Sequence, residues 1–90
     1  MSVKVHLYSG LQYYTRDQHI IEVNGSTVGD CLADLVKRYP EISASIFEEN
    51  GQLQNTVFVS INLESPYPEP LTKTLKAGDD LYVILVVAGG

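Results

Sequence analysis

The sequence is poor in the residues that carry metal, redox or nucleophilic chemistry. Its one cysteine, Cys31, excludes an internal disulfide and cannot form a CxxC pair. Its two histidines, His6 and His19, have no companion ligand at a metal-binding spacing. The chain also has no phosphate-binding loop and no paired nucleophile and base. We therefore expect a protein that is not an enzyme in its own right and that binds no cofactor or metal.

Basic residues and long apolar runs are also scarce. Six Lys and Arg stand against eleven Asp and Glu, and the net charge of −5 at pH 7 would be repelled by nucleic-acid phosphates and by anionic lipid. The longest apolar run, 81–88, is far shorter than the roughly 20 residues that span a bilayer, and the first residues do not resemble a signal peptide. We expect no nucleic-acid partner, no membrane partner and a cytoplasmic location.

The remaining composition suits one small domain. The chain has 90 residues, of which 44% are hydrophobic, and this supports a single core without disulfides or metals. Apolar and polar residues alternate in 3–8, 19–23 and 56–62, a pattern typical of half-buried strands. The β-branched run 81–87 predicts a further strand, and segment 71–75 favours a short edge strand.

A helical period replaces the alternation after Thr27. Apolar residues at i, i+3, i+4, i+7, i+8 and i+11 form one stripe, which consists of Val28, Cys31, Leu32, Leu35, Val36 and Tyr39. Thr27 is placed to cap the helix, with the Asp30 side chain reaching back toward it. Pro40 ends the helix because it supplies no donor and restricts the residue before it. A short helical turn is expected within 41–47, and the proline-spaced segment 65–70 is expected to be a surface loop.

The order of these elements predicts the fold class. Two strands, a crossing helix and two or three later strands correspond to an α+β, β-grasp (ubiquitin-like) fold. We expect a mixed sheet of four to five strands, with the last strand beside the first and one main helix packed across one face. The β-grasp domain is expected to span 1–87, and residues 88–90 are expected to form a flexible Gly-Gly tail.

The sequence ends in Ala88-Gly89-Gly90 soon after the last apolar strand. A Gly-Gly end has a chance of about one in two hundred, taking glycine at about 7% of residues. Two interpretations are open: a frayed terminus or expression scar, and a side-chain-free end that enters a narrow channel in a partner. Residues 87–90 would project about 13 Å at roughly 3.3 Å per residue. The apolar strand that anchors them favours the second interpretation.

Several segments resemble a known family. The Gly-Asp turn in 75–81 and the Val-Ala-Gly-Gly end at 87–90 look like the corresponding parts of molybdopterin synthase small subunits. The segments 27–32 and 39–41 are similar to that family's helix start and its Tyr-Pro-Glu stretch. The chain thus resembles the MoaD/ThiS family of ubiquitin-like sulfur carriers, and its MoaD-like members in particular. Leu85-Val86 departs from the prolines that commonly precede the family's Val-Ala-Gly-Gly.

The resemblance implies that Gly90 is the working group. An E1-like adenylyltransferase would use ATP to adenylate its carboxylate, and sulfide equivalents would displace AMP to give a thiocarboxylate. Val87, Ala88 and Gly89 would thread into the partner's channel. The sulfur would pass to a synthase large subunit, most specifically that of molybdopterin synthase in molybdenum or tungsten cofactor biosynthesis. The chain would then be a protein cosubstrate or non-catalytic small subunit.

Other functions fit the same tail. Sulfur carriers for thiamine, cysteine or tRNA thiolation share the thiocarboxylate chemistry. A ubiquitin-like modifier that forms isopeptides through Gly90 is the alternative from another functional class. The β-grasp fold alone does not distinguish these possibilities, because a fold does not determine a function.

The sheet face opposite the helix is the predicted partner interface. Alternation leaves an apolar set on this face, which consists of Tyr8, Phe58, Tyr82, Ile84 and Val86. These residues could instead pack under the proline loop or meet at a dimer contact. Cys31 is expected to be an inert buried thiol, and the two histidines to have no catalytic role. The acidic residues of the turns are expected to be solvated, namely Asp79, Asp80, Glu48 and Glu49.

Overall fold

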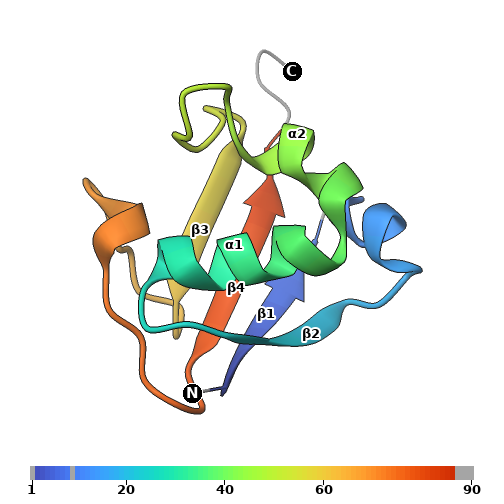
Figure 1. The fold of residues 1–90 in the computed structure, drawn as a ribbon. Coiled ribbons are helices and arrows are strands. Elements are labelled where there is room, and N and C mark those ends of the chain that lie inside the picture. Colours follow the sequence, from blue (N-terminus) through green and yellow to red (C-terminus); the bar gives the residue numbers. More distant parts are fainter. Residues whose placement is uncertain (1, 9, 87–90) are drawn as a thin grey trace.

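The strands of the described chain form one sheet, and the helices lie against one of its faces (Figure 1). The structure is a computed structural model that describes residues 2–8 and 10–86. In chain order the strands and α-helices are β1 (Ser2–Leu7), β2 (Ile20–Asn24), α1 (Val28–Arg38), α2 (Ser43–Ile46), β3 (Val57–Ile61) and β4 (Asp80–Leu85). Short 3-10 helices lie between them, namely η1 (Leu11–Thr15), η2 (Pro40–Ile42) and η3 (Pro70–Thr72).

The strand order is β2-β1-β4-β3, so the last strand lies beside the first in the middle of the sheet. β1 pairs in parallel with β4 and antiparallel with β2, and β3 is antiparallel to β4. The register places Val5 opposite Leu81 on one side and Ile21 on the other. A parallel pair needs a long crossover connection, and the chain that includes α1 provides it. The predicted α+β, β-grasp fold is confirmed, with a sheet of four strands in the described residues.

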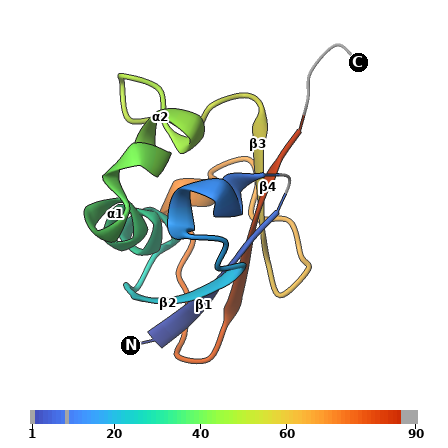
Figure 2. The same cartoon turned by 90° about the vertical axis from the view of Figure 1, so that its right-hand side faces the viewer.

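Alternating residues of the strands build one wall of the core. Val3, Val5 and Leu7 of β1 are fully buried, while the residues between them face the other side of the sheet. The apolar stripe of α1 closes the core from the helix side through Val28, Cys31, Leu32 and Leu35. Figure 2 shows α1 and α2 on the same side of the sheet. Full burial of an aliphatic side chain contributes about 1.5–3 kcal/mol, so these positions are the main source of the fold's stability.

Local hydrogen bonds and one proline set the limits of α1. The Asp30 N–H donates to Oγ1 of Thr27 over 3.1 Å, as expected for an N-cap. The Asp30 carboxylate accepts from the Ser26 hydroxyl over 3.2 Å, so the expectation that it reaches back to Thr27 was wrong. At the other end, Pro40 starts η2 because it has no N–H with which to continue α1.

Segment 71–75 is not the edge strand that the sequence favoured. Its first residues belong to η3, and Thr74 makes an isolated β-bridge to Thr27, ahead of α1. Pro70 favours a tight turn because its φ is fixed and it lacks a donor. The segment therefore runs beside the start of α1, where the Val28 N–H donates to the Lys73 carbonyl over 3.0 Å.

Two other connections also contain helical turns. The turn expected within 41–47 is confirmed by η2 and α2, whereas the loop after β1 contains η1, which was not predicted. Leu11 and Thr15 of η1 are fully buried. The Thr15 hydroxyl lies 3.0 Å and 2.8 Å from the carbonyls of Gln12 and Gln18, which accept its hydrogen bond. Because this polar group is satisfied, the loop can add to the core.

Candidate functional site

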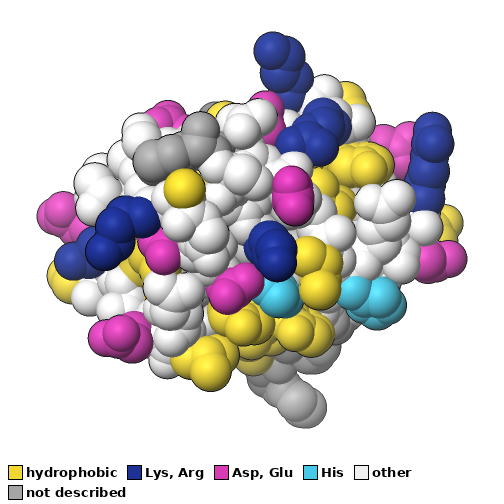
Figure 3. Space-filling view, turned by 90° about the horizontal axis from the view of Figure 1, so that it is seen from below, with side chains coloured by type: hydrophobic (Ala, Val, Ile, Leu, Met, Phe, Trp, Pro, Cys, Tyr) yellow, Lys and Arg dark blue, Asp and Glu magenta, His cyan; other side chains and the backbone are white. Residues whose placement is uncertain are grey.

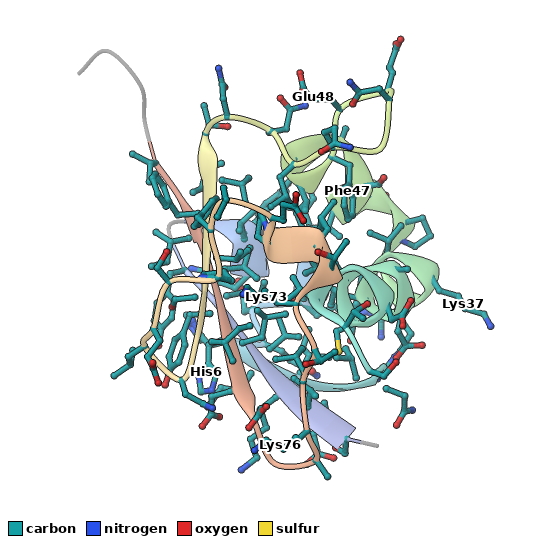
Figure 4. All side chains as sticks on the ribbon, turned by 90° about the vertical axis from the view of Figure 1, so that its left-hand side faces the viewer. His6, Lys37, Phe47, Glu48, Lys73 and Lys76 are labelled. Carbon is teal, nitrogen blue, oxygen red and sulfur yellow. The ribbon has the colours of Figure 1, made fainter. Side chains whose placement is uncertain are left out.

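The sheet face opposite α1 carries the predicted interface. Figure 4 shows His6 on this side of the sheet and Lys37 of α1 on the other. Outward side chains alternate with core residues along each strand. The register aligns them in rows, which pair Lys4 with Asp80, His6 with Tyr82, and Phe58 with Ile84. The rows near the start of β4 are polar, and those near its end are apolar.

The apolar end of this face contains the predicted interface residues, hereafter the apolar patch. The patch consists of Tyr8, Phe58, Tyr82, Ile84 and Val86, of which Tyr82 is half-buried and the others are exposed. Phe58 and Ile84 are cross-strand partners, and the rings of Tyr8 and Tyr82 stack with centroids 6.3 Å apart. Phe58 is 53% exposed and Ile84 37%. Figure 3 shows hydrophobic side chains gathered beside a histidine at this margin. Exposed clusters of this kind are typical of protein–protein contact sites.

The proline loop covers the margin of the patch without burying it. The Tyr67 ring packs edge-on against Phe58, with centroids 5.6 Å apart. Its hydroxyl accepts the Val59 N–H over 3.2 Å, at the outer edge of the sheet. Tyr67, which lies between two prolines in the sequence, was not among the predicted interface residues. Of the alternatives to a partner interface, packing under the proline loop is seen for Phe58, and its side chain still remains half exposed.

Asp79 and Asp80, at the polar end of this face, are partly exposed and are also held by hydrogen bonds. Oδ1 of Asp80 lies 2.9 Å from Nε2 of His6. The Asp79 carboxylate accepts from the Lys76 N–H over 2.7 Å and from the Asn62 amide over 3.2 Å. These bonds, that from Lys76 foremost, hold the pKa of the Asp79 carboxyl below its ordinary value. The Gly-Asp turn is therefore an ordered start to β4.

Cys31 is buried in the core, as expected. Burial raises the pKa of the Cys31 thiol to about 11, and the carboxylates of Asp30 and Asp34 add to the rise. The thiolate is the reactive form of cysteine, so a thiol with this pKa stays protonated at neutral pH. The structure gives Cys31 a packing role.

Val86 directly follows β4 and is the last described residue before the tail. Its N–H donates to the Thr56 carbonyl over 2.6 Å. The predicted thiocarboxylate site, Gly90, and the threading residues at 87–89 lie outside the described residues, so these assignments stay predictions. Because Val86 belongs to the apolar patch, the tail begins at that patch.

Within residues 2–8 and 10–86, no helix is long and apolar enough to cross a membrane. The same part of the chain brings together no group of three or more potential metal ligands. The expectations on location and on cofactors remain predictions.

Comparison with known proteins relates the chain to small ubiquitin-like proteins. The sequence pattern of the ThiS family matches residues 5–90. Small archaeal modifier protein 1 of Haloferax volcanii is 34% identical over 71 residues, which are 78% of each chain. Its crystal structure matches with a TM-score of 0.87 at 28% identity, over 100% of both chains.

Two further structures have the same fold. A chain in the crystal structure of the BexX/CysO complex of Amycolatopsis orientalis is 29% identical, with a TM-score of 0.87 over 98% of this chain and 99% of that one. A putative molybdopterin converting factor, subunit 1, of Pyrococcus furiosus is 20% identical, with a TM-score of 0.74 over 97% and 99% of the two chains. At that identity the likeness shows the fold alone.

Proposed function

The chain belongs to the ThiS family, whose members are small carrier or modifier proteins, and we propose that it is a sulfur carrier that works through Gly90. The observation that carries this proposal is the position of the apolar patch, which includes Val86, the residue that directly precedes the tail. A partner that binds the patch meets the tail at a fixed starting point. Residues 87–90 reach at most about 13 Å from there, at roughly 3.3 Å per residue.

Activation of Gly90 needs a partner because a carboxylate is a poor electrophile at neutral pH. An E1-like adenylyltransferase would join a carboxylate oxygen to the α-phosphorus of ATP and release pyrophosphate. A sulfide equivalent then attacks the carbonyl carbon, forms a C–S bond and expels AMP. The resulting thiocarboxylate is ionised at neutral pH and is a soft nucleophile, as a thiolate is. In this scheme the chain is a protein cosubstrate, and ATP is bound by the partner.

For the sulfur acceptor we propose a synthase large subunit. Molybdopterin synthase, in molybdenum or tungsten cofactor biosynthesis, is the specific candidate that the Gly-Asp turn and the Val-Ala-Gly-Gly end support. Carriers for thiamine, cysteine or tRNA thiolation use the same thiocarboxylate. The likeness to a chain of the BexX/CysO complex supports a partner protein in general and favours neither kind of acceptor. The chemistry at Gly90 is the same in each case.

A ubiquitin-like protein modifier is the second candidate function. The 34% identity to small archaeal modifier protein 1 favours it. The adenylated Gly90 would then react with a lysine amine, form an isopeptide bond and release AMP. Both functions need the same adenylation step. They differ in the nucleophile that then attacks the adenylated Gly90, which is a sulfide equivalent in one case and a lysine amine in the other.

Intact-mass analysis of the untagged protein from its native cells separates the two functions. A sulfur carrier shows an oxygen-to-sulfur exchange at Gly90 in part of the population. Lysine-linked conjugates without that exchange would overturn the sulfur-carrier proposal.

Gly90→Ala tests the site itself, because an added Cβ narrows the fit in the activating enzyme's channel and should slow adenylation. Equal rates of AMP formation by Gly90→Ala and by the wild type would contradict the assignment of Gly90 as the adenylation site.

A further inference from the structure

A groove lies beside the apolar patch, along the outer edge of β3. It has a volume of about 550 Å³ and runs between the loop before β3 and the proline loop. In Figure 4 the loop before β3 lies above η3, and the proline loop runs into η3 from the left. Leu53, Val57 and Leu71 contribute apolar walls. Phe58 and Tyr67 also line the groove, and since Phe58 belongs to the patch the two surfaces are continuous.

The groove also adjoins the origin of the tail. The Thr56 carbonyl holds the Val86 N–H, and the neighbours of Thr56 on both sides, Asn55 and Val57, line the groove. The chain continues beyond Val86 for residues 87–90, which span at most about 13 Å at roughly 3.3 Å per residue. Any protein that holds Gly90 therefore lies close enough to reach the groove.

The edge of β3 inside the groove cannot accept an added strand without a change in the chain. The Val57 N–H donates to the Gln54 carbonyl over 3.0 Å, and the Val59 N–H donates to the Tyr67 hydroxyl over 3.2 Å. Gln54 is itself held in place, since its side-chain amide donates to the Phe47 carbonyl over 3.1 Å. With these donors in use, a partner has to enter the groove with a side chain.

The lining defines the chemistry of that side chain. The walls are apolar, the rim carries the amides of Gln52 and Asn55, and Glu69 is the charged residue among those that line the groove. An aliphatic or aromatic side chain fits the walls, and a backbone beside it can bond to the amides. A basic neighbour would face Glu69, in keeping with the net charge of −5.

We propose that this groove receives an apolar side chain, next to a basic residue, from the E1-like enzyme that adenylates Gly90. The proposal rests on the proposed function. The groove acts as an anchor that holds the carrier while the tail enters the enzyme's active site. An anchor of this kind affects how tightly the carrier binds and leaves the adenylation chemistry unchanged.

Gln52→Trp tests the groove by filling it. The Gln52 side chain is exposed and makes no hydrogen bond of its own within the described structure, while its backbone bonds can persist. With the cognate activating enzyme, we expect the KM for the carrier to rise about tenfold and kcat to stay within about twofold. Gln18→Trp is the matched control, because Gln18 is also exposed but lies between η1 and β2, on the opposite side of the molecule in Figure 1.

Glu69→Lys tests the charge, with Glu49→Lys as the control for the same charge change at an exposed residue outside the groove. We expect Glu69→Lys to raise KM about fivefold more than the control does, and added salt to reduce the difference. The rate of pyrophosphate release gives KM and kcat for both pairs of variants. Circular dichroism checks that each variant is folded. Equal KM values within both pairs would overturn the groove proposal and leave the proposed function standing. A wild-type chain that the enzyme does not adenylate would overturn both.

Discussion

The turn after β3 holds Leu63 in a conformation that favours glycine. Asn62 and Leu63 have φ values of 50° and 69°, and the backbones of Ile61 and Glu64 exchange hydrogen bonds of 2.9 Å and 2.8 Å. This is the pattern of a type I′ turn, in which Asn-Gly is the preferred pair. A Cβ in the left-handed region costs about 1–2 kcal/mol. Leu63 is 78% exposed, so burial does not offset that cost.

We expect Leu63→Gly to raise the free energy of unfolding by about 0.5–1 kcal/mol. Relief of the Cβ penalty exceeds the roughly 0.5–1 kcal/mol that glycine costs through chain entropy. Urea unfolding followed by circular dichroism measures the change. Tyr13→Gly is the matched control, because Tyr13 is also 78% exposed but lies outside the left-handed region, and it should lower stability. A loss of stability in both variants would contradict the argument.

Cys31 is predicted to stay unmodified by thiol reagents in the folded protein and to react once urea unfolds it. Its burial and its raised pKa both disfavour the thiolate. Cys31→Ala should still acquire the thiocarboxylate at the wild-type level, as measured by intact mass. A folded Cys31→Ala variant that no longer acquires sulfur would show that the thiol relays it.

At the scale of elements, the periodicity of apolar residues predicted the strands and the helix whose formation is determined by local sequence. β1, β2, β3 and α1 each bury one face, so the spacing of apolar residues in the sequence was enough to find them. The apolar patch followed from the same alternation. The path of segment 71–75 was missed because it depends on contacts with segments distant in sequence, such as the bridge from Thr74 to Thr27. The contact between His6 and Asp80 likewise depends on the parallel register of β1 and β4.

The outer edge of β3 is closed by the chain itself. Its outward N–H groups donate to a loop carbonyl, to a side-chain hydroxyl and to a turn carbonyl; the pairs are Val57 with Gln54, Val59 with Tyr67, and Ile61 with Glu64. Edge strands with free donors invite pairing with other chains. The Tyr67 hydroxyl is therefore a protective feature as well as a stabilising one.

Tyr67→Phe should lower the free energy of unfolding by about 1–3 kcal/mol, because the Val59 N–H loses its partner while the ring contact with Phe58 remains. Tyr13→Phe removes a hydroxyl from a ring that is 78% exposed and should leave stability unchanged. Urea unfolding compares the two variants. If they unfold at the same urea concentration, the hydroxyl does not hold the strand edge.

At the scale of the whole molecule, the helices and the apolar patch occupy opposite faces of the sheet. The core side gives stability, and the other side presents the patch and the start of the tail. The sequence predicted this division because a single long helix can cover only one face. It could not reveal the groove, which is formed by loops whose positions depend on tertiary contacts.

Ile84→Glu is expected to raise the KM of the activating enzyme for the carrier by about tenfold or more, because it places a charge in the middle of the apolar patch. Ile20→Glu is the matched control: Ile20 is 54% exposed and lies on β2, at the far edge of the sheet. Steady-state kinetics with folded variants measures the difference. Similar KM values for Ile84→Glu and Ile20→Glu would mean that the patch is not the docking surface.

The central place of β4 has a mechanical consequence. β4 lies between β1 and β3, and it is the strand from which the tail continues. Tension applied to the tail along the strand axis therefore loads the hydrogen bonds to both neighbours in shear, so many bonds must break at once. An edge strand pulled sideways would instead open one bond at a time. Under the proposed function, an enzyme that draws the tail into its channel can thus pull on the chain without unravelling it.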